Sequence, residues 1–132
     1  MANLNLIIVD EERLARVNLR RLLEPFPDIE ISGETNSCAG ALELVSIHNP
    51  QLIFLDIDLH GETGFDLLEF IDNSIKIIIV TAYDEDVINT LEMRPFDYLS
   101  KPVNPESLRE AIEMLKEQFY HRCRIQQMEP SY

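Results

Sequence analysis

Several residue types are scarce in this sequence, and each scarcity excludes a class of protein. Its 132 residues include two cysteines, four glycines and no tryptophan. Cys38 and Cys123 stand alone, without the spacing of a disulfide framework or a zinc site, so we expect two reduced thiols in a cytoplasmic protein. No apolar run approaches the roughly 20 residues that span a bilayer. Residues 1–5 show no basic segment before an apolar one, so we expect no signal peptide.

Basic residues are also few. Lys and Arg number 11 against 24 Asp and Glu, which gives a formal charge of −13. Binding to nucleic acid needs clustered Lys and Arg that neutralise phosphates, so we expect no direct nucleic-acid binding by this domain. The length suits a single domain whose core needs neither disulfides nor a structural metal.

Short apolar runs that end on polar residues predict five strands. They alternate with segments in which apolar residues recur every three or four positions, as on one face of a helix. The expected strands cover residues 5–9, 30–35, 52–55, 76–81 and 97–100, and the expected helices cover about 12–24, 37–49, 64–71, 84–91 and 104–119. This alternation predicts an α/β fold: a doubly wound, flavodoxin-like parallel sheet of five strands in the order 2-1-3-4-5, with five helices.

Chemically active side chains follow four of these strands. Asp10 and Glu11 follow the first strand and Asp56 the third, while Thr81 ends the fourth and Lys101 follows the fifth. Open α/β sheets bind ligands at the C-terminal ends of their strands, where the strand order reverses. Each residue alone has an ordinary interpretation as a helix start, a turn or a strand residue. Together at one sheet edge they predict a site, with Asp56 as its reactive group.

Carboxylates that gather at one point repel each other unless a cation lies between them. Mg²⁺ suits such a site, because it binds through one or two carboxylates, water and phosphoryl oxygens. Lys101 and Thr81 would supply donors for the remaining phosphoryl oxygens. The residues therefore predict phosphoryl transfer onto Asp56, which gives an acyl phosphate.

Four motifs, at residues 7–12, 56–58, 80–82 and 97–103, span nearly the whole chain. With them, the sequence resembles receiver domains of bacterial two-component response regulators. Residues 13–16, 19–23 and 98–103 further resemble receivers attached to LytTR-type DNA-binding domains. The narrower resemblance implies transcription regulation through an output domain absent from this chain.

The resemblance implies that a sensor histidine kinase phosphorylates Asp56 in a Mg²⁺-dependent reaction. Such a domain is a phosphoacceptor switch and not a turnover enzyme. Asp10, Glu11 and Asp56 would hold the metal together with the backbone carbonyl of Asp58. Lys101 would contact the phosphoryl group.

The resemblance also implies a conformational switch. Thr81 would turn its hydroxyl toward phosphorylated Asp56, Tyr98 would follow inward, and the small Ala82 would leave room for the phosphoryl oxygens. The change would reshape the surface formed by the fourth helix, the fifth strand and the fifth helix, through which a homodimer is expected. The bond between Lys101 and Pro102 is expected to be cis.

The sequence departs from the family pattern in three places. Glu11 stands where Asp is usual, and we expect altered metal affinity because its side chain is longer. His60 replaces a common proline and would change the stiffness of its loop. Arg94 and Pro95 replace small residues, which affects the geometry expected for the fourth helix.

Two other functions remain open on the sequence alone. The Asp-x-Asp of residues 56–58 also resembles haloacid-dehalogenase-like phosphohydrolases, in which Asp58 would be the general acid, although no later acidic pair ends a strand. A receiver-like interaction module that is never phosphorylated is the other alternative, and Glu11 favours it. We expect the receiver to cover residues 1–120 and residues 121–132 to be a helix end or the start of a linker.

Overall fold

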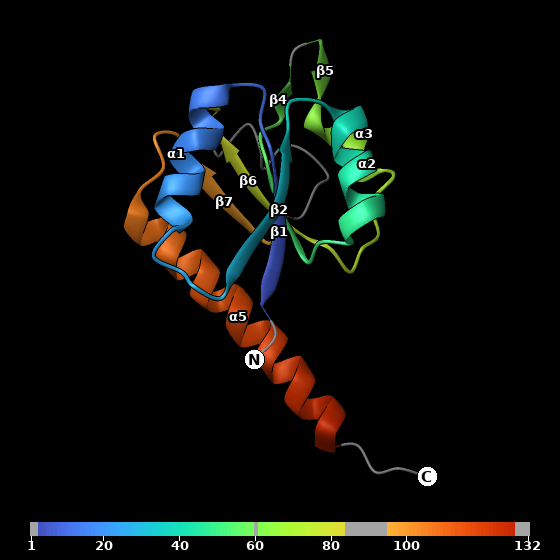
Figure 1. The fold of residues 1–132 in the computed structure, drawn as a ribbon, viewed down its shortest axis with the longest axis vertical. Helices are drawn as coiled ribbons and strands as arrows, with labels where there is room; N and C mark the ends of the chain where they lie inside the picture. Colours follow the sequence, from blue (N-terminus) through green and yellow to red (C-terminus); the bar gives the residue numbers. More distant parts are fainter. Residues whose placement is uncertain (1–2, 60, 84–94, 129–132) are drawn as a thin grey trace.

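A five-stranded parallel sheet forms the centre of the computed structural model, which describes residues 3–59, 61–83 and 95–128 (Figure 1). Its strands are β1 (Leu4–Val9), β2 (Ile29–Thr35), β3 (Leu52–Leu55), β6 (Lys76–Thr81) and β7 (Asp97–Ser100). They lie in the order β2-β1-β3-β6-β7. Counted along the chain within this sheet, that is the order 2-1-3-4-5, so the prediction of a flavodoxin-like α/β sheet is confirmed.

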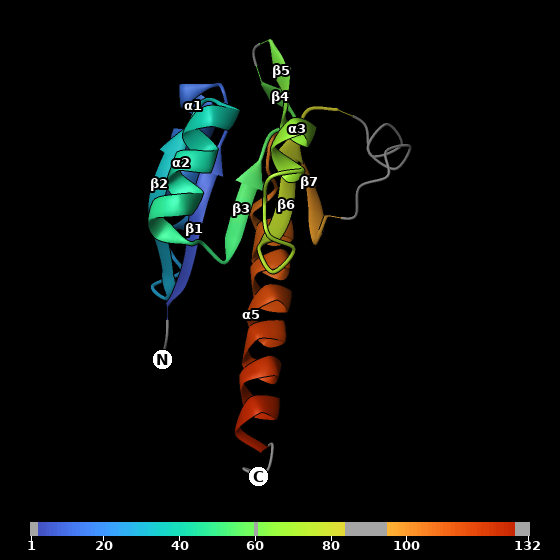
Figure 2. The same ribbon diagram turned by 90° about the vertical axis from the view of Figure 1, so that its right-hand side faces the viewer.

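Helices cover both faces of the sheet. The described part of the chain contains α1 (Arg13–Leu23), α2 (Cys38–His48), α3 (Gly64–Leu68) and α5 (Pro105–Met128). One face packs against α1 and α5 and the other against α2 and α3 (Figures 1 and 2). The fourth expected helix, over residues 84–91, lies outside the described residues, as do His60 and Arg94.

The central strands are apolar on both sides because each face of the sheet has its own core. Along β3, Phe54 joins the core under α1 and α5, whereas Leu55 joins the core under α2 and α3. Val9 of β1 pairs with Leu55, and Leu55 pairs with Ile79 of β6. This register places the residues that follow β1 and β3 side by side at one edge of the sheet.

Polar side chains mark two helix starts. Ser37 accepts a hydrogen bond from the backbone N–H of Gly40 at 3.0 Å and so caps α2. Asn104 accepts from the N–H groups of Glu106 and Ser107 at 2.8 and 3.3 Å at the start of α5. Each cap satisfies helix N–H groups that have no partner within the helix.

The helices differ in length from the expectation at two places. α3 ends at Leu68 instead of near Ile71, where the N–H of Phe70 donates to the carbonyl of Leu67 at 3.0 Å in a turn tighter than the α-helix. The chain turns again at Asp72, whose side chain accepts from the N–H of Ser74 at 2.9 Å. Leu67 of α3, which the sequence analysis did not single out, is fully buried. α5 continues to Met128, well past residue 119, where the sequence analysis expects this helix to end. Figure 2 shows it extending far beyond the sheet.

A small hairpin was not expected. β4 (Asp58–Leu59) and β5 (Glu62–Thr63) pair antiparallel beyond the end of β3, with Gly61 at a φ of 73° in the turn between them. Glycine adopts that left-handed conformation at little cost. Within residues 3–59, 61–83 and 95–128, no helix combines the length and the apolar character needed to cross a membrane.

Candidate functional site

Three of the expected site residues follow parallel strands, and backbone hydrogen bonds fix each one. Asp10 follows β1, Asp56 follows β3 and Lys101 follows β7. Their N–H groups donate to the carbonyls of Thr35, Val9 and Thr81 at 3.1, 2.9 and 2.9 Å, respectively. The hydrogen bonding between neighbouring strands therefore continues for one bond past the end of β1, β3 and β7. The backbone at the three site residues is fixed by these bonds.

Lys101 brings the two aspartates together. Its Nζ lies 2.8 Å from Oδ2 of Asp10 and 2.8 Å from Oδ2 of Asp56. Both carboxylates are buried, with 5% and 6% of the residue exposed. A shared ammonium group between them offsets the repulsion that two buried carboxylates would otherwise feel.

The pKa values of Asp10 and Lys101 reflect this arrangement. Burial raises the pKa of Asp10 above its ordinary value, and the hydrogen bond from Lys101 offsets only part of that rise. Burial alone would lower the pKa of Lys101, but its contacts with Asp10 and Asp56 outweigh burial and raise it. Lys101 is therefore a firmly charged group at neutral pH, suited to hold anionic oxygens.

The second oxygen of each aspartate accepts from the backbone two residues further on. Oδ1 of Asp10 accepts from the N–H of Glu12 at 2.9 Å, and Oδ1 of Asp56 accepts from the N–H of Asp58 at 3.0 Å. Each carboxylate is thus held on one side by the backbone and on the other by Lys101. The side chain of Asp58 is itself exposed, on β4.

Gly64 packs against the backbone that carries Asp56. A Cβ atom on Gly64 would lie 3.0 Å from the carbonyl oxygen of Asp56 and 3.1 Å from the Cα of Ile57. The N–H of Gly64 also donates to the carbonyl of Ile57 at 3.0 Å. α3 can approach the site this closely only because residue 64 has no side chain.

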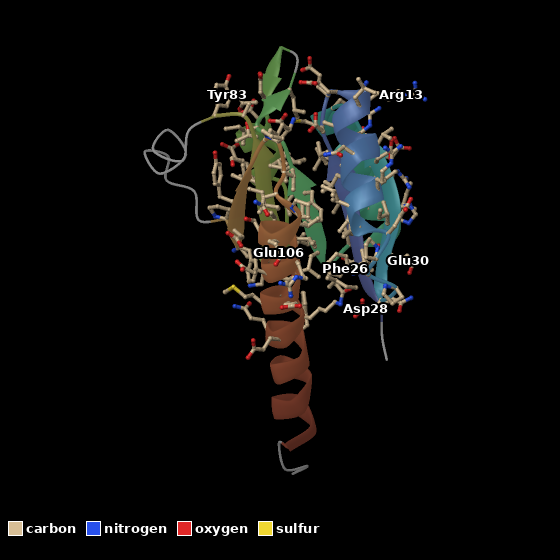
Figure 3. The ribbon with its side chains drawn as sticks, turned by 90° about the vertical axis from the view of Figure 1, so that its left-hand side faces the viewer. Arg13, Phe26, Asp28, Glu30, Tyr83 and Glu106 are labelled. Carbon is tan, nitrogen blue, oxygen red and sulfur yellow. The ribbon has the colours of Figure 1, made fainter. Side chains whose placement is uncertain are left out.

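Thr81 and Tyr98 meet at the peptide groups of Tyr83. Thr81, only 1% exposed, accepts from the N–H of Tyr83 through Oγ1 at 3.5 Å. The hydroxyl of Tyr98 donates to the carbonyl of Tyr83. Figure 3 shows Tyr83 at the same end of the sheet as Arg13, which begins α1. Ala82, which lies between Thr81 and Tyr83 in the sequence, is exposed just after the end of β6.

The donor set fits Mg²⁺ through the two aspartates that meet. Mg²⁺ commonly uses one or two carboxylates and fills its other positions with water and phosphoryl oxygens. Among the described residues, no three His, Cys, Asp or Glu side chains gather into a metal cage. Glu11 is half-buried in the turn after β1, and its backbone carbonyl accepts from Arg16.

The peptide bond between Lys101 and Pro102 is cis, as predicted.

The sequence did not single out four residues that contact the site: Arg16, Glu34, Gly64 and Tyr83. Arg16, Gly64 and Tyr83 contribute through contacts with backbone groups, and Glu34 through an ion pair with Arg16, and neither kind of contact leaves a signature in residue type or spacing.

Comparison with known proteins identifies the family. Residues 6–113 match the model of the response regulator receiver domain. Sensory transduction protein LytT of Bacillus anthracis is 33% identical over 127 residues, which cover 94% of this chain and 52% of LytT. Transcriptional regulatory protein BtsR of Salmonella typhi is 38% identical over 120 residues, which cover 87% of this chain and 49% of BtsR. The chain therefore spans about half the length of these relatives, and they confirm the resemblance to LytTR-type regulators.

Solved structures share the fold. The receiver domain of AraT, a response regulator from Geobacillus stearothermophilus, superposes with a TM-score of 0.78 at 26% identity and covers 89% of this chain and 96% of its own. The RcsB response regulator of Salmonella typhimurium superposes with a TM-score of 0.79 at 22% identity over 89% of this chain and 62% of RcsB. Sequence motifs, strand order and relatives agree: this chain belongs to the response regulator receiver domain family of two-component signalling.

Proposed function

We propose that Asp56 accepts a phosphoryl group and that this reaction switches the domain between two states. The observation that carries the proposal is the position of the Lys101 ammonium group, 2.8 Å from both Asp56 and Asp10 at the C-terminal edge of the sheet. A buried carboxylate beside a fixed cation is suited to attack phosphorus while the cation stabilises the phosphoryl oxygens.

The transfer step conserves atoms and charge. An oxygen of Asp56 bonds to phosphorus as the bond from phosphorus to the donor breaks, and the leaving group keeps that electron pair. The leaving group is acetate from acetyl phosphate or a histidine nitrogen from a kinase. The contact between Lys101 and Asp56 is exchanged for one with the phosphoryl oxygens.

Asp10, Glu11, Asp56 and the carbonyl of Asp58 would hold Mg²⁺. The metal, when bound, supplies positive charge that neutralises the carboxylates and the phosphoryl oxygens. The chain's own contribution is to orient the carboxylates, through the N–H groups of Glu12 and Asp58.

The switch would act through Tyr83. Thr81 leaves the N–H of Tyr83 when its hydroxyl turns to the phosphoryl group, and Tyr98 then gives up the carbonyl of Tyr83 and moves inward. Phosphorylation thus shifts a two-state equilibrium by differential contacts. The surface that changes includes β7 and α5 and would form a homodimer or bind a partner.

The wider context is part of the same proposal. The phosphoryl donor would be a sensor histidine kinase, the location the cytoplasm, and the output transcription through a DNA-binding domain. Residues 1–120 would form the receiver, with residues 121–132 as its helix end or the start of a linker.

Intact mass after incubation with acetyl phosphate tests the proposal. We expect wild-type protein to gain one phosphoryl group with Mg²⁺ and none without it. Asp56→Asn should gain none, whereas the matched control Asp58→Asn, which removes one charge from an exposed neighbour and keeps its backbone, should still be labelled. Continuous hydrolysis of a phosphate ester that Asp58→Asn abolishes would support a phosphohydrolase instead. No adduct on protein that binds Mg²⁺ would support an unphosphorylated interaction module.

A further inference from the structure

The side chain of Arg16, on α1, contacts the turn between β1 and α1. This turn contains two of the proposed metal-binding residues, Asp10 and Glu11. Its Nη1 donates to the carbonyl of Asp10 at 2.7 Å and to the carbonyl of Glu11 at 3.2 Å. Its Nε lies 3.1 Å from Oε1 of Glu34, near the end of β2. One guanidinium group therefore connects a helix, a strand and the turn of the site.

The backbone of Asp10 is consequently held from both sides. Its N–H donates to Thr35 at 3.1 Å, and its carbonyl accepts from Arg16. Thr35 and Glu34 are the last two residues of β2, so both routes lead to the same strand end. Charge-assisted hydrogen bonds to two successive carbonyls restrict rotation of the peptide groups that set where the side chains of Asp10 and Glu11 begin.

Glu34 holds Arg16 in that position. Its other oxygen forms an ion pair with Arg20, one turn further along α1. The side chains of Arg16 and Glu34 are 15% and 27% exposed, so water screens this pair less than an open surface pair. Burial would raise the pKa of Glu34, but hydrogen bonds from Arg20 and Arg16 outweigh it and lower the pKa, which keeps the carboxylate charged.

We propose that Arg16 is a positioning residue for cation binding, and that Glu34 orients Arg16 for this role. Arg16 fixes the backbone of Asp10 and Glu11, and thereby the points from which their side chains extend, without contacting the cation. The role matters for this chain because Glu11 has one more rotatable bond than the usual aspartate, and with the backbone fixed only side-chain rotation remains to be restricted when the cation binds. The inference rests on the proposed function.

Charge alone predicts the opposite effect, which makes the idea testable. Arg16 is a cation near a cation site, so simple repulsion predicts that Arg16→Gln tightens Mg²⁺ binding and that Arg16→Lys leaves it unchanged. Positioning predicts weaker binding in both variants, since lysine cannot reproduce the planar fork that reaches Glu34 and two carbonyls.

Calorimetric titration with Mg²⁺, in the absence of a phosphoryl donor, separates these outcomes. We expect Arg16→Gln and Arg16→Lys to weaken Mg²⁺ binding by roughly tenfold, as loss of a group that orients metal ligands does. Arg20→Gln is the matched control, because Arg20 pairs with the same Glu34 and has no contact with either carbonyl among the described hydrogen bonds, and it should bind close to wild type. Unchanged binding in both Arg16 variants, or tighter binding in Arg16→Gln, overturns the proposal.

Hydrogen exchange of metal-free protein tests the positioning role of Arg16 without depending on Mg²⁺ binding or on phosphorylation. The N–H of Glu12 donates to Oδ1 of Asp10 and reports the order of the turn. We expect it to exchange faster in Arg16→Lys and at the wild-type rate in Arg20→Gln, at similar melting temperatures. Unchanged exchange in Arg16→Lys overturns the positioning role. Wild-type protein that binds no Mg²⁺ but shows this exchange pattern would instead count against the metal dependence of the proposed function.

Discussion

The Nζ atom of Lys101 lies 2.8 Å from Oδ2 of Asp56, although 45 positions separate the two residues in the sequence. β3 and β7 are not neighbours, and β6 lies between them. The contact is possible because a lysine side chain is long enough to cross the end of β6, and a backbone hydrogen bond to Thr81 sets its starting point.

Replacing Lys101 by methionine tests what this contact does. Arg or Lys donors at a site where anionic charge develops contribute strongly to rate, so we expect Lys101→Met to slow phosphoryl transfer from acetyl phosphate by roughly a hundredfold. Time courses of intact mass measure the rate. Lys116→Met, which removes a paired lysine from α5, is the control and should be labelled at the wild-type rate. Equal rates in Lys101→Met and wild type would show that this ammonium group has no role in the reaction.

Gly64→Ala should damage the site through packing. The new Cβ would meet the backbone of Asp56 and Ile57 at 3.0 and 3.1 Å, so one of the two segments must move. Such overpacking costs about 1–3 kcal/mol, and we expect slower labelling as well as a lower free energy of unfolding in urea. Gly61→Ala offers a contrast, since nothing lies within 4 Å of its added Cβ and its cost comes from a φ of 73°. It should lose stability and keep its labelling rate.

Thr81→Val should separate phosphorylation from its structural consequence. The hydroxyl of Thr81 accepts from the N–H of Tyr83, and valine keeps the shape of the side chain without the acceptor. We expect the variant to be phosphorylated while the amide resonance of Tyr83 moves less than in wild type when acetyl phosphate is added. An equal shift in wild type and Thr81→Val would show that the signal reaches Tyr83 by another route.

An ion pair far from the site predicts a dependence of stability on pH. Lys116 of α5 lies 2.7 and 2.6 Å from the two oxygens of Asp28, and its Nζ lies 5.5 Å from the ring centre of Phe26. Figure 3 shows Phe26 and Asp28 on the side that faces α5. The hydrogen bond from Lys116 lowers the pKa of Asp28 below its ordinary value of 3.8. The stabilisation from this ion pair is therefore fully present above pH 3.8, the ordinary pKa of Asp28. It is lost as the pH falls through the lower pKa that Asp28 has in the folded protein.

Asp28→Asn should reduce the free energy of unfolding at pH 7 by up to about 1 kcal/mol, because both side chains are partly exposed and solvent screens the pair. The difference from wild type should shrink as the pH falls below 3.8, since a protonated Asp28 carries no charge, like the asparagine that replaces it. Urea unfolding at a series of pH values measures this difference in free energy of unfolding. Glu30→Gln is the control for the loss of one nearby negative charge. A difference that stays constant down to acid pH would contradict this account of the pair.

The strands and the aspartates could be predicted from sequence because local patterns encode them. Residues 52–55 are a continuous apolar run, and residues 77–80 form the apolar centre of the strand at 76–81; each strand was predicted to the residue. The position of Asp56 follows from β3 alone. Its meeting with Asp10 follows from the strand order, which short right-handed connections restrict to few alternatives.

Features held by backbone geometry could not be predicted in this way. The β4–β5 hairpin has strands of two residues, too short for any alternation to be visible. Arg16 occupies the polar side of an amphipathic helix, where arginine is ordinary, and nothing in its spacing indicates a contact with two carbonyls. Gly64 has no side chain whose type could indicate a role. Its role is to let α3 approach the backbone of Asp56 closely.

Reduction of the phosphorylated protein with borohydride identifies the phosphoryl acceptor, since it converts an aspartyl phosphate to homoserine. After labelling with acetyl phosphate and Mg²⁺, peptide mapping by mass spectrometry locates the reduced residue. We expect homoserine at position 56 and aspartate at positions 10 and 58. Homoserine at another position, or a stable adduct that borohydride does not reduce, would show that Asp56 is not the phosphoryl acceptor.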